Sequence, residues 1–144
     1  MKPTPNIPVG TIAENTITVT REMTVAHFRD EMPEVFGTPI MIYYMEVTAS
    51  DAIVPHLPEG WVSVGVLVNV KHLAATPVGM KVKLTARVIE VGHNAITFAV
   101  EAYDEVEKIG EGIHVRAPVE MSRFIKRVQG KEQRAKGEEQ RAKR

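Results

Sequence analysis

Four stretches in the second half of the chain alternate apolar and polar residues with a period of two. They cover residues 61–72, 80–88, 96–103 and 109–121, and turns are predicted between them at 76–79, 92–94 and 104–108. Such alternation predicts strands with one apolar and one solvated face, as in an antiparallel sheet that is covered on one side. Taken at every second residue, the rows expected to face the core are Val62 to Val70, Met80 to Val88, Ile96 to Ala102 and Ile113 to Val119.

The first half of the chain predicts one more strand, a flap and a central helix. Ile17 and Val19 alternate with polar residues after a proline-containing lead-in over residues 1–15, and residues 24–37 suit a short helix or an irregular flap. A helix is predicted over 38–54, with Thr38 as its N-cap and Pro39 at the first helical position. Apolar residues surround most of this helix, so we expect it to be buried on most sides. The result is an α+β fold in which a curved antiparallel sheet wraps a long central helix.

Length and charge place the chain among ordinary globular proteins. Its 144 residues fit a single domain, predicted over 1–128, followed by a charged tail over 129–144 that nearly repeats KEQRAK as EEQRAK. We expect this tail to be a solvated helix or a disordered end, and a partner-binding segment is the alternative. With 18 basic and 18 acidic residues the net charge is zero, which argues against nucleic-acid and anionic-membrane partners.

Several classes of site lack support in the sequence. The absence of cysteine excludes disulfides, thiolate nucleophiles and Cys-ligated metals. No histidine pair has metal-site spacing, and no GxSxG, GxGxxG or phosphate-cradling motif is present, so we expect neither a metal nor a bound cofactor. The first residues have no apolar core typical of a secretory signal, and no stretch approaches the roughly 20 apolar residues of a membrane span. We therefore expect a soluble cytoplasmic protein.

Glu46 is the most informative single residue. It lies in the predicted central helix, and its neighbours on the helical wheel are mainly apolar. Burying a carboxylate costs free energy unless it is paired, hydrogen-bonded or protonated. Glu46 is therefore a candidate catalytic group, although a solvent gap or a structural partner would also explain it.

His72 and Thr38 supply two further candidates. His72 continues the row of Val62 to Val70, so it is expected to face the core unless a bulge near Gly65 or Asn69 changes the parity. An inward histidine that faces the same layer as an inward carboxylate indicates a site. A purely structural hydrogen bond is the alternative. Thr38 begins the helix, and its hydroxyl is a possible nucleophile only with a base nearby.

Three stretches of the sequence together resemble the fluoroacetyl-CoA thioesterase group of hotdog proteins. They are MPEVFGTPIMIYYMEVTASDAIVPHLPEG, SVGVLVNVKHLAATPVGMKVKLTARV and IGEGIHVRA, and the resemblance covers about residues 17–125. It implies a homodimer, possibly a dimer of dimers, whose sheets join edge to edge with two sites at the subunit interface. It also implies hydrolysis of an acyl-CoA thioester, with coenzyme A as part of the substrate.

The resemblance assigns roles to individual residues. Thr38, Glu46 and His72 would act together as the catalytic group in one cavity. The backbone of Gly65 and the side chain of Arg116 would line the acyl end, although Arg116 has outward parity unless a bulge lies near Gly110, Gly112 or Pro118. Met32 and Phe36 would contribute to the substrate pocket.

Met32 stands where the fluoroacetyl-specific enzyme has a phenylalanine lid. Methionine is flexible and fills gaps without a fixed shape, so an ordinary short acyl group is the expected substrate. Three alternatives stay open: a hotdog hydratase or dehydratase, a non-catalytic acyl-CoA-binding protein, and a structural dimer module in which Glu46 and His72 merely satisfy each other.

Overall fold

The computed structural model describes residues 6–142. Its strands are β1 (Ile12–Thr18), β2 (Trp61–His72), β3 (Lys81–Val91), β4 (Ile96–Tyr103) and β5 (Lys108–Glu120). The longer helices are α2 (Thr38–Ile53) and α3 (Met121–Ala142), and the short helical turns are η1 (Arg21–Met23), α1 (Val25–Phe28) and η2 (Val54–His56). The predicted order of one strand, a flap, a central helix and four strands is confirmed.

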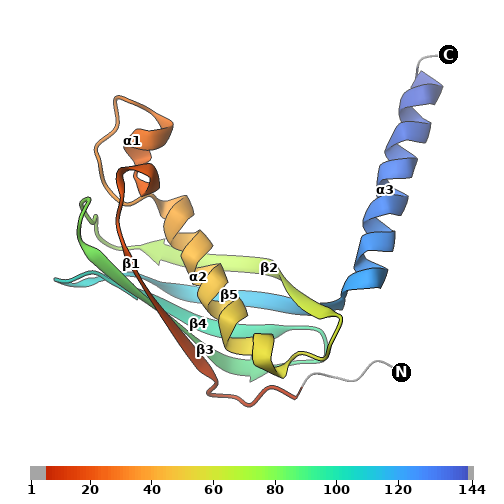
Figure 1. Cartoon of the computed structure of the whole chain (residues 1–144), viewed down its shortest axis with the longest axis horizontal. Coiled ribbons are helices and arrows are strands. Elements are labelled where there is room, and N and C mark those ends of the chain that lie inside the picture. The colour runs from red at the N-terminus through yellow and green to blue at the C-terminus, as the bar shows by residue number, and fades with distance from the viewer. Residues whose placement is uncertain (1–5, 143–144) are drawn as a thin grey trace.

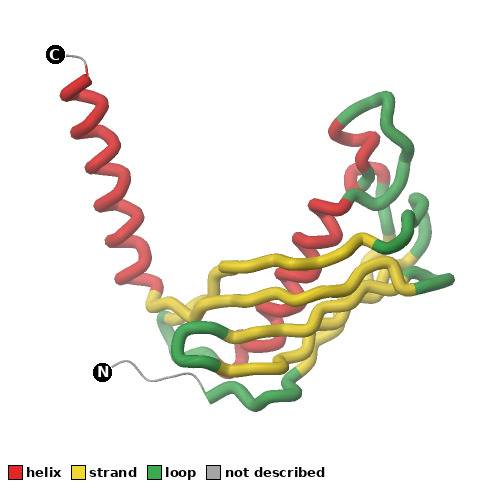
Figure 2. Tube along the Cα trace, turned by 180° about the vertical axis from the view of Figure 1, so that it is seen from behind, coloured by secondary structure: helices red, strands yellow, loops and turns green. Residues whose placement is uncertain are grey.

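The five strands form one antiparallel sheet in the order β1-β3-β4-β5-β2. The sheet curves around α2, which crosses one of its faces (Figures 1 and 2). The core lies between them, and its largest fully buried apolar side chains include Phe36, Met41, Met45, Leu84 and Phe98. Strand β2 lies at one edge of the sheet, where it pairs with β5 along its inner side.

The N-cap of helix α2 lies one residue earlier than predicted. Gly37 is the N-cap, with an extended backbone at φ −78° and ψ 138°, and its carbonyl accepts from the Met41 N–H at 3.0 Å. Thr38 is therefore the first helical residue and Pro39 the second, so the N-cap assignment of Thr38 is wrong. This leaves the Thr38 hydroxyl free for a partner outside the helix.

Helix α2 is also buried over a smaller part of its circumference than predicted. The buried residues form one stripe, and on another side Tyr43 is 57% exposed. Within one chain, the expectation of burial on most sides is wrong, because the sheet covers only the face of the helix that packs on it.

Two bulges change which side chains face α2. In β2 the register with β5 shifts between Gly65 and Leu67, so Val66 is an extra residue. Val62 and Val64 consequently fall on the opposite face from Val68 and Val70, and the single predicted row is wrong. His72 stays in phase with Val68 and Val70, as expected.

In β5 the register with β4 shifts at Ile109, between the pairs Ala102–Gly110 and Tyr103–Lys108. Beyond this bulge the even-numbered residues face α2, and His114 and Arg116 are buried. The predicted core row of Ile113, Val115, Ala117 and Val119 is therefore wrong, because these residues lie on the outer face of the sheet.

The two ends of the chain differ from the predicted boundaries. Strand β1 begins at Ile12, within the expected lead-in, and Asn15 Nδ2 donates to Thr48 Oγ1 at 2.9 Å and to Asp51 Oδ2 at 3.0 Å on α2. At the other end, α3 begins at Met121 and carries most of the charged tail in one helix that extends away from the sheet (Figure 1).

Candidate active site

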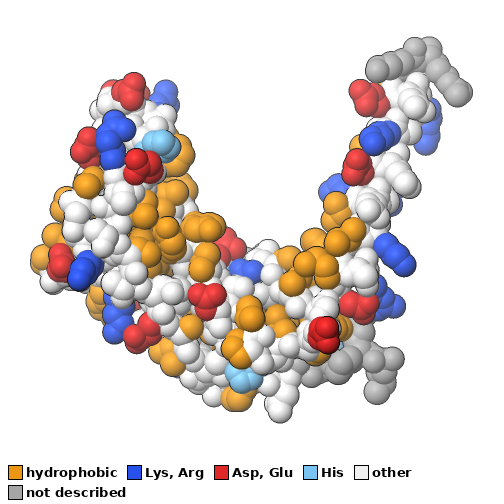
Figure 3. Space-filling model, in the orientation of Figure 1, with side chains coloured by type: hydrophobic (Ala, Val, Ile, Leu, Met, Phe, Trp, Pro, Cys, Tyr) orange, Lys and Arg blue, Asp and Glu red, His pale blue; other side chains and the backbone are white. Residues whose placement is uncertain are grey.

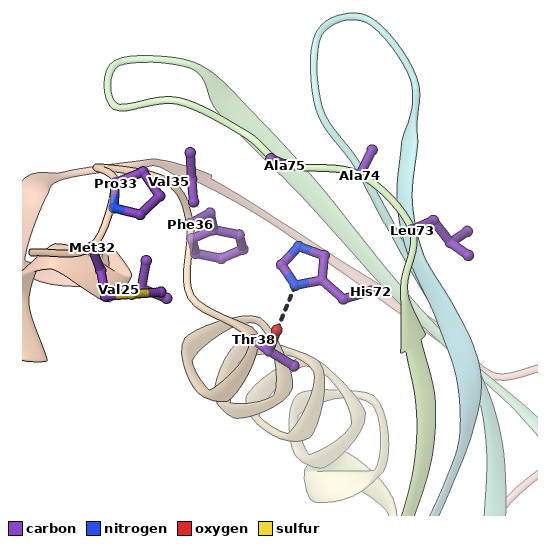
Figure 4. A pocket seen from close by; sticks show the side chains of 10 residues that line it. All are labelled: Val25, Met32, Pro33, Val35, Phe36, Thr38, His72, Leu73, Ala74 and Ala75. Carbon is purple, nitrogen blue, oxygen red and sulfur yellow. Dashed lines mark hydrogen bonds between the residues drawn. The ribbon is translucent and has the colours of Figure 1, made fainter. Parts of the chain in front are cut away.

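Thr38 and His72 meet at the start of α2. The Thr38 hydroxyl and His72 Nδ1 are 2.7 Å apart, which is a short hydrogen bond between the first residue of α2 and the last residue of β2. They lie in a cavity of about 450 Å³ between the flap and the loop after β2. Figure 4 shows the His72 imidazole between Thr38 and the ring of Phe36.

Burial lowers the pKa of His72, which favours the neutral imidazole. A neutral imidazole has one donor and one acceptor nitrogen. Nδ1 is occupied by Thr38, whereas Nε2 is buried and has no hydrogen-bond partner among residues 6–142. A buried polar atom without a partner is costly, and the backbone group that acts on the His72 pKa is that of Ala74, so Nε2 is the His72 atom whose partner the described part of the single chain does not supply.

The flap residues predicted to bind substrate line the same cavity. Phe36 is buried at its inner end and Met32 is exposed at its rim, with Val25, Pro33 and Val35 beside them. Loop residues Leu73, Ala74 and Ala75 complete the lining (Figure 4). The cavity wall is therefore largely apolar around one threonine and one histidine.

Glu46 lies in a different hollow, of about 300 Å³, which it lines together with Tyr43, Ser50, Asp51 and Arg116. Because Glu46 is eight residues after Thr38 on the same helix, their backbones are separated by about 12 Å along the axis. The expectation that Thr38, Glu46 and His72 share one cavity is therefore not met within a single chain.

Arg116 holds Glu46 from the sheet. Its Nη1 lies 3.4 Å from Glu46 Oε2, and its Nε and Nη2 donate to the hydroxyl and the carbonyl of Ser63 at 2.8 and 2.9 Å. The Nη1 group also lies 3.2 Å from His114 Nε2. The guanidinium is thus fixed on three sides and aimed at the carboxylate.

His114 is a buried neighbour that holds Arg116 by a hydrogen bond. Its side chain is 1% exposed, and its ring stacks on Phe98 with the centroids 6.1 Å apart. Since a guanidinium only donates, His114 Nε2 is the acceptor, and Nδ1–H donates to the Leu67 carbonyl at 2.8 Å. Burial lowers the pKa of His114 and thereby favours this neutral form.

Gly65 lies beside the same carboxylate. It pairs with Arg116 across β2 and β5, and a Cβ placed on Gly65 would lie 2.6 Å from Glu46 Oε2. A Cβ at position 65 would therefore clash with the carboxylate in the position it has beside Arg116. Gly65 and Arg116 are therefore together, as the resemblance implied, but next to Glu46 and away from Thr38 and His72.

Sequence reasoning did not identify Ser63 and His114 as parts of the site. His114 was placed on the outward parity of its strand, and Ser63 had no distinguishing pattern. The shift at Ile109 turns His114 inward, and the extra residue Val66 turns Ser63 inward. The glycines next to these bulges, Gly65 and Gly110, are the sequence signal that could have indicated them.

Among residues 6–142, no cluster of three or more His, Asp or Glu side chains is arranged to hold a metal ion. A search of the same residues for a helix long and apolar enough to cross a membrane finds none.

The sequence is similar to that of one family of thioesterases. The family model described as fluoroacetyl-CoA-specific thioesterase matches residues 19–122. The fluoroacetyl-CoA thioesterase of Streptantibioticus cattleyicolor is 39% identical over 101 residues, which cover 70% of this chain and 73% of that enzyme.

Solved structures agree with the sequence match. A structure of the fluoroacetyl-CoA thioesterase FlK superposes with a TM-score of 0.83 and 34% identity, over 88% of this chain and 98% of that one. The Thermus thermophilus protein TTHA0967, described as a thioesterase superfamily member, gives a TM-score of 0.86 and 30% identity over 95% and 99%. This chain therefore belongs to the fluoroacetyl-CoA-specific thioesterase family, has the hotdog fold and is a thioester hydrolase.

Proposed function

We propose that this protein hydrolyses short acyl-CoA thioesters to the acid and free CoA, at two sites formed between the subunits of a homodimer. Each site would combine Thr38 and His72 of one subunit with Glu46, Gly65 and Arg116 of the other. The observation that carries this proposal is the 2.7 Å contact of Thr38 with a histidine whose second nitrogen is buried and unpartnered in its own chain.

The edge of the sheet suggests how the two halves meet. Strand β2 is outermost, and the polar backbone groups along its free side are a template for a second strand. Antiparallel pairing of two β2 strands about a two-fold axis at Asn69, with Val66 as the extra residue of the bulge, sets His72 opposite the partner's Gly65. Because Gly65 lies against Glu46 in its own chain, the same pairing brings Glu46 of one subunit towards His72 of the other.

Chemistry at such a composite site needs no group from outside the protein except water. The thioester carbonyl would lie near the start of α2, where the Thr38 N–H and the Gly65 backbone would stabilise the developing oxyanion, since Pro39 has no N–H and those of Ile40 and Met41 donate to Gly37. Glu46 either takes a proton from the attacking water or adds to the carbonyl carbon itself, giving an anhydride that water then opens. In both routes the C–S bond breaks and CoA leaves as the thiolate, and the proton released by the attacking water passes to neutral His72 and from there to the CoA sulfur.

The pocket favours a small acyl group without demanding fluorine. Its wall near Thr38 and His72 is apolar, and flexible Met32 occupies the rim. A pocket that senses only a small change in the acyl group discriminates by about 10- to 200-fold. We therefore expect acetyl-, propionyl- and fluoroacetyl-CoA to be turned over with kcat/KM values within that range of each other, as measured by thiol release.

Mixing two inactive variants tests the composite site. Thr38→Ala and Glu46→Gln subunits are each expected to lose most activity. In a co-refolded mixture about half of the dimers are mixed, and each mixed dimer has one intact site, so activity should recover to about a quarter of wild type. A mixture that forms mixed dimers but stays as inactive as its parents would contradict the proposal.

A further inference from the structure

Helix α3 has an apolar stripe that its own chain leaves open. Met121, Phe124, Ile125 and Val128 recur at the i, i+3, i+4 and i+7 spacing of one helix face. Ile125 is 44% and Val128 51% exposed. Figure 3 shows apolar side chains gathered at the base of α3, facing the hollow between α3 and the rest of the molecule.

The composition of α3 makes it a weak helix by itself. Gly130 and Gly137 lie in its interior, and each costs about 1 kcal/mol relative to alanine. The described ion pair within the helix, Lys136 with Glu132 at 3.3 Å, contributes only about 0.2–0.5 kcal/mol. In its own chain α3 packs mainly on β5, the strand that it continues. Because most helical stability comes from packing of an apolar face, the stripe needs a covering surface.

The sheet register indicates which surface reaches it. Trp61 pairs with Glu120, so α3 rises at the beginning of β2, whereas the flap and Thr38 lie at the end of β2, next to His72. Figure 1 shows α3 and the flap at opposite ends of the sheet, on the same side as α2. In the two-fold dimer proposed above, antiparallel pairing of two β2 strands brings the end of the partner's β2, with its flap, beside the beginning of this one.

The flap is chemically suited to the stripe. The flap, residues 24–37, exposes apolar Phe28 at 61% as well as Met32. It has three acidic side chains and one basic one, whereas residues 121–142 have seven basic and three acidic ones. In the proposed dimer, apolar surface would therefore meet apolar surface, and the two segments have opposite net charge.

We propose that the α3 stripe of each subunit docks on the flap of its partner and holds that flap over the Thr38–His72 cavity. This inference rests on the dimer in the proposed function. Residues 121–142 lie almost wholly beyond the span 19–122 that the family model matches, so the family match by itself assigns α3 no role. By fixing Met32 and Phe36, which line the cavity, α3 would control how well the acyl group is enclosed.

Cross-linking tests the contact directly, because the chain has no cysteine. Subunits with Phe28→Cys and differently tagged subunits with Ile125→Cys are assembled into mixed dimers and treated with a short bismaleimide. We expect a covalent dimer that contains both tags. The matched control is Gln133→Cys, which lies about 80° or more from each stripe residue on the helical wheel and should give little product.

Activity supplies the second readout. The double variant Ile125→Glu with Val128→Glu should lower kcat/KM about tenfold while the protein stays folded, and Gln133→Glu with Gln140→Glu, which adds the same charge off the stripe, should not. Wild-type kcat/KM in the stripe variant, together with no cross-link in an intact dimer, would overturn the docking and leave the proposed function standing. A protein that is active as a monomer would overturn both. Stripe-dependent binding to phosphatidylglycerol vesicles without a cross-link would overturn the docking and assign α3 to a membrane surface.

Discussion

Arg116 and His114 show how single residues set the position of a reactive group. Arg116 donates to Ser63 through two nitrogens and reaches Glu46 and His114 through the third. His114 in turn donates to the Leu67 carbonyl, which directly follows the extra residue of the β2 bulge. One imidazole therefore ties the guanidinium that faces Glu46 to the irregular backbone that carries Gly65.

Two substitutions separate the two hydrogen bonds of His114. Glutamine can place an acceptor at the depth of Nε2 and keep the Arg116 contact, whereas asparagine can keep only the donor to Leu67. A lost hydrogen bond to a charged group costs about 1.5–3 kcal/mol. We therefore expect His114→Asn to lower kcat about tenfold or more, with kcat of His114→Gln within a few-fold of wild type.

Stability measurements provide the control for this pair. Both substitutions remove the ring that stacks on Phe98, so they should lower the free energy of unfolding by similar amounts. Equal kcat values in the two variants, after correction for the folded fraction, would show that His114 acts only in packing and would contradict a positioning role.

At the scale of elements, the sequence predicted the type and order of the strands and helices but not which faces they present. Period-two alternation identified β2 to β5, because alternation depends only on neighbouring residues. A bulge shifts this parity by a single residue. Gly65 and Gly110, which lie next to the two bulges, marked places where such a shift would change the parity, but alternation alone does not reveal whether one occurs. The sequence identified Glu46, His72 and Arg116 as candidates. It did not show that Arg116 faces inward and contacts Glu46, because this depends on the pairing register of β2, β4 and β5.

The close approach of α2 to β2 predicts a sharp effect at Gly65. Gly65→Ala would place a methyl group 2.6 Å from Glu46 Oε2, so the carboxylate must move away from Arg116. We expect at least about a tenfold fall in kcat/KM with a change of no more than about 1–3 kcal/mol in stability, the usual cost of overpacking. Gly137→Ala, where nothing lies within 4 Å of the added Cβ, controls for the extra methyl group. Unchanged turnover in folded Gly65→Ala would show that the position of Glu46 does not matter.

At the scale of the whole molecule, one chain holds two halves of a site that its own helix keeps apart. About 12 Å of α2 separates Thr38 from Glu46, and no local adjustment of side chains closes that distance. Sequence reasoning placed Glu46 and His72 on inward faces, and the resemblance put them with Thr38 in one cavity at a subunit interface, without saying which subunit supplies which residue. The separation becomes functional only if a second copy supplies the missing half.

A charge placed at the proposed two-fold axis tests this last step. Asn69 is exposed on β2, and in the dimer two Asn69→Asp side chains would lie about 6 Å apart across the axis. Like charges at that distance near a protein surface repel by about 1–3 kcal/mol, so the dimer should dissociate at about tenfold higher concentration, as measured by sedimentation equilibrium. Specific activity should fall over the same concentration range, because monomers have only half-sites.

Asn6→Asp, which adds the same charge in the exposed segment before β1, should change neither curve. Full activity per chain in a dilute, monomeric Asn69→Asp protein would refute the shared site, because each chain would then complete the chemistry alone.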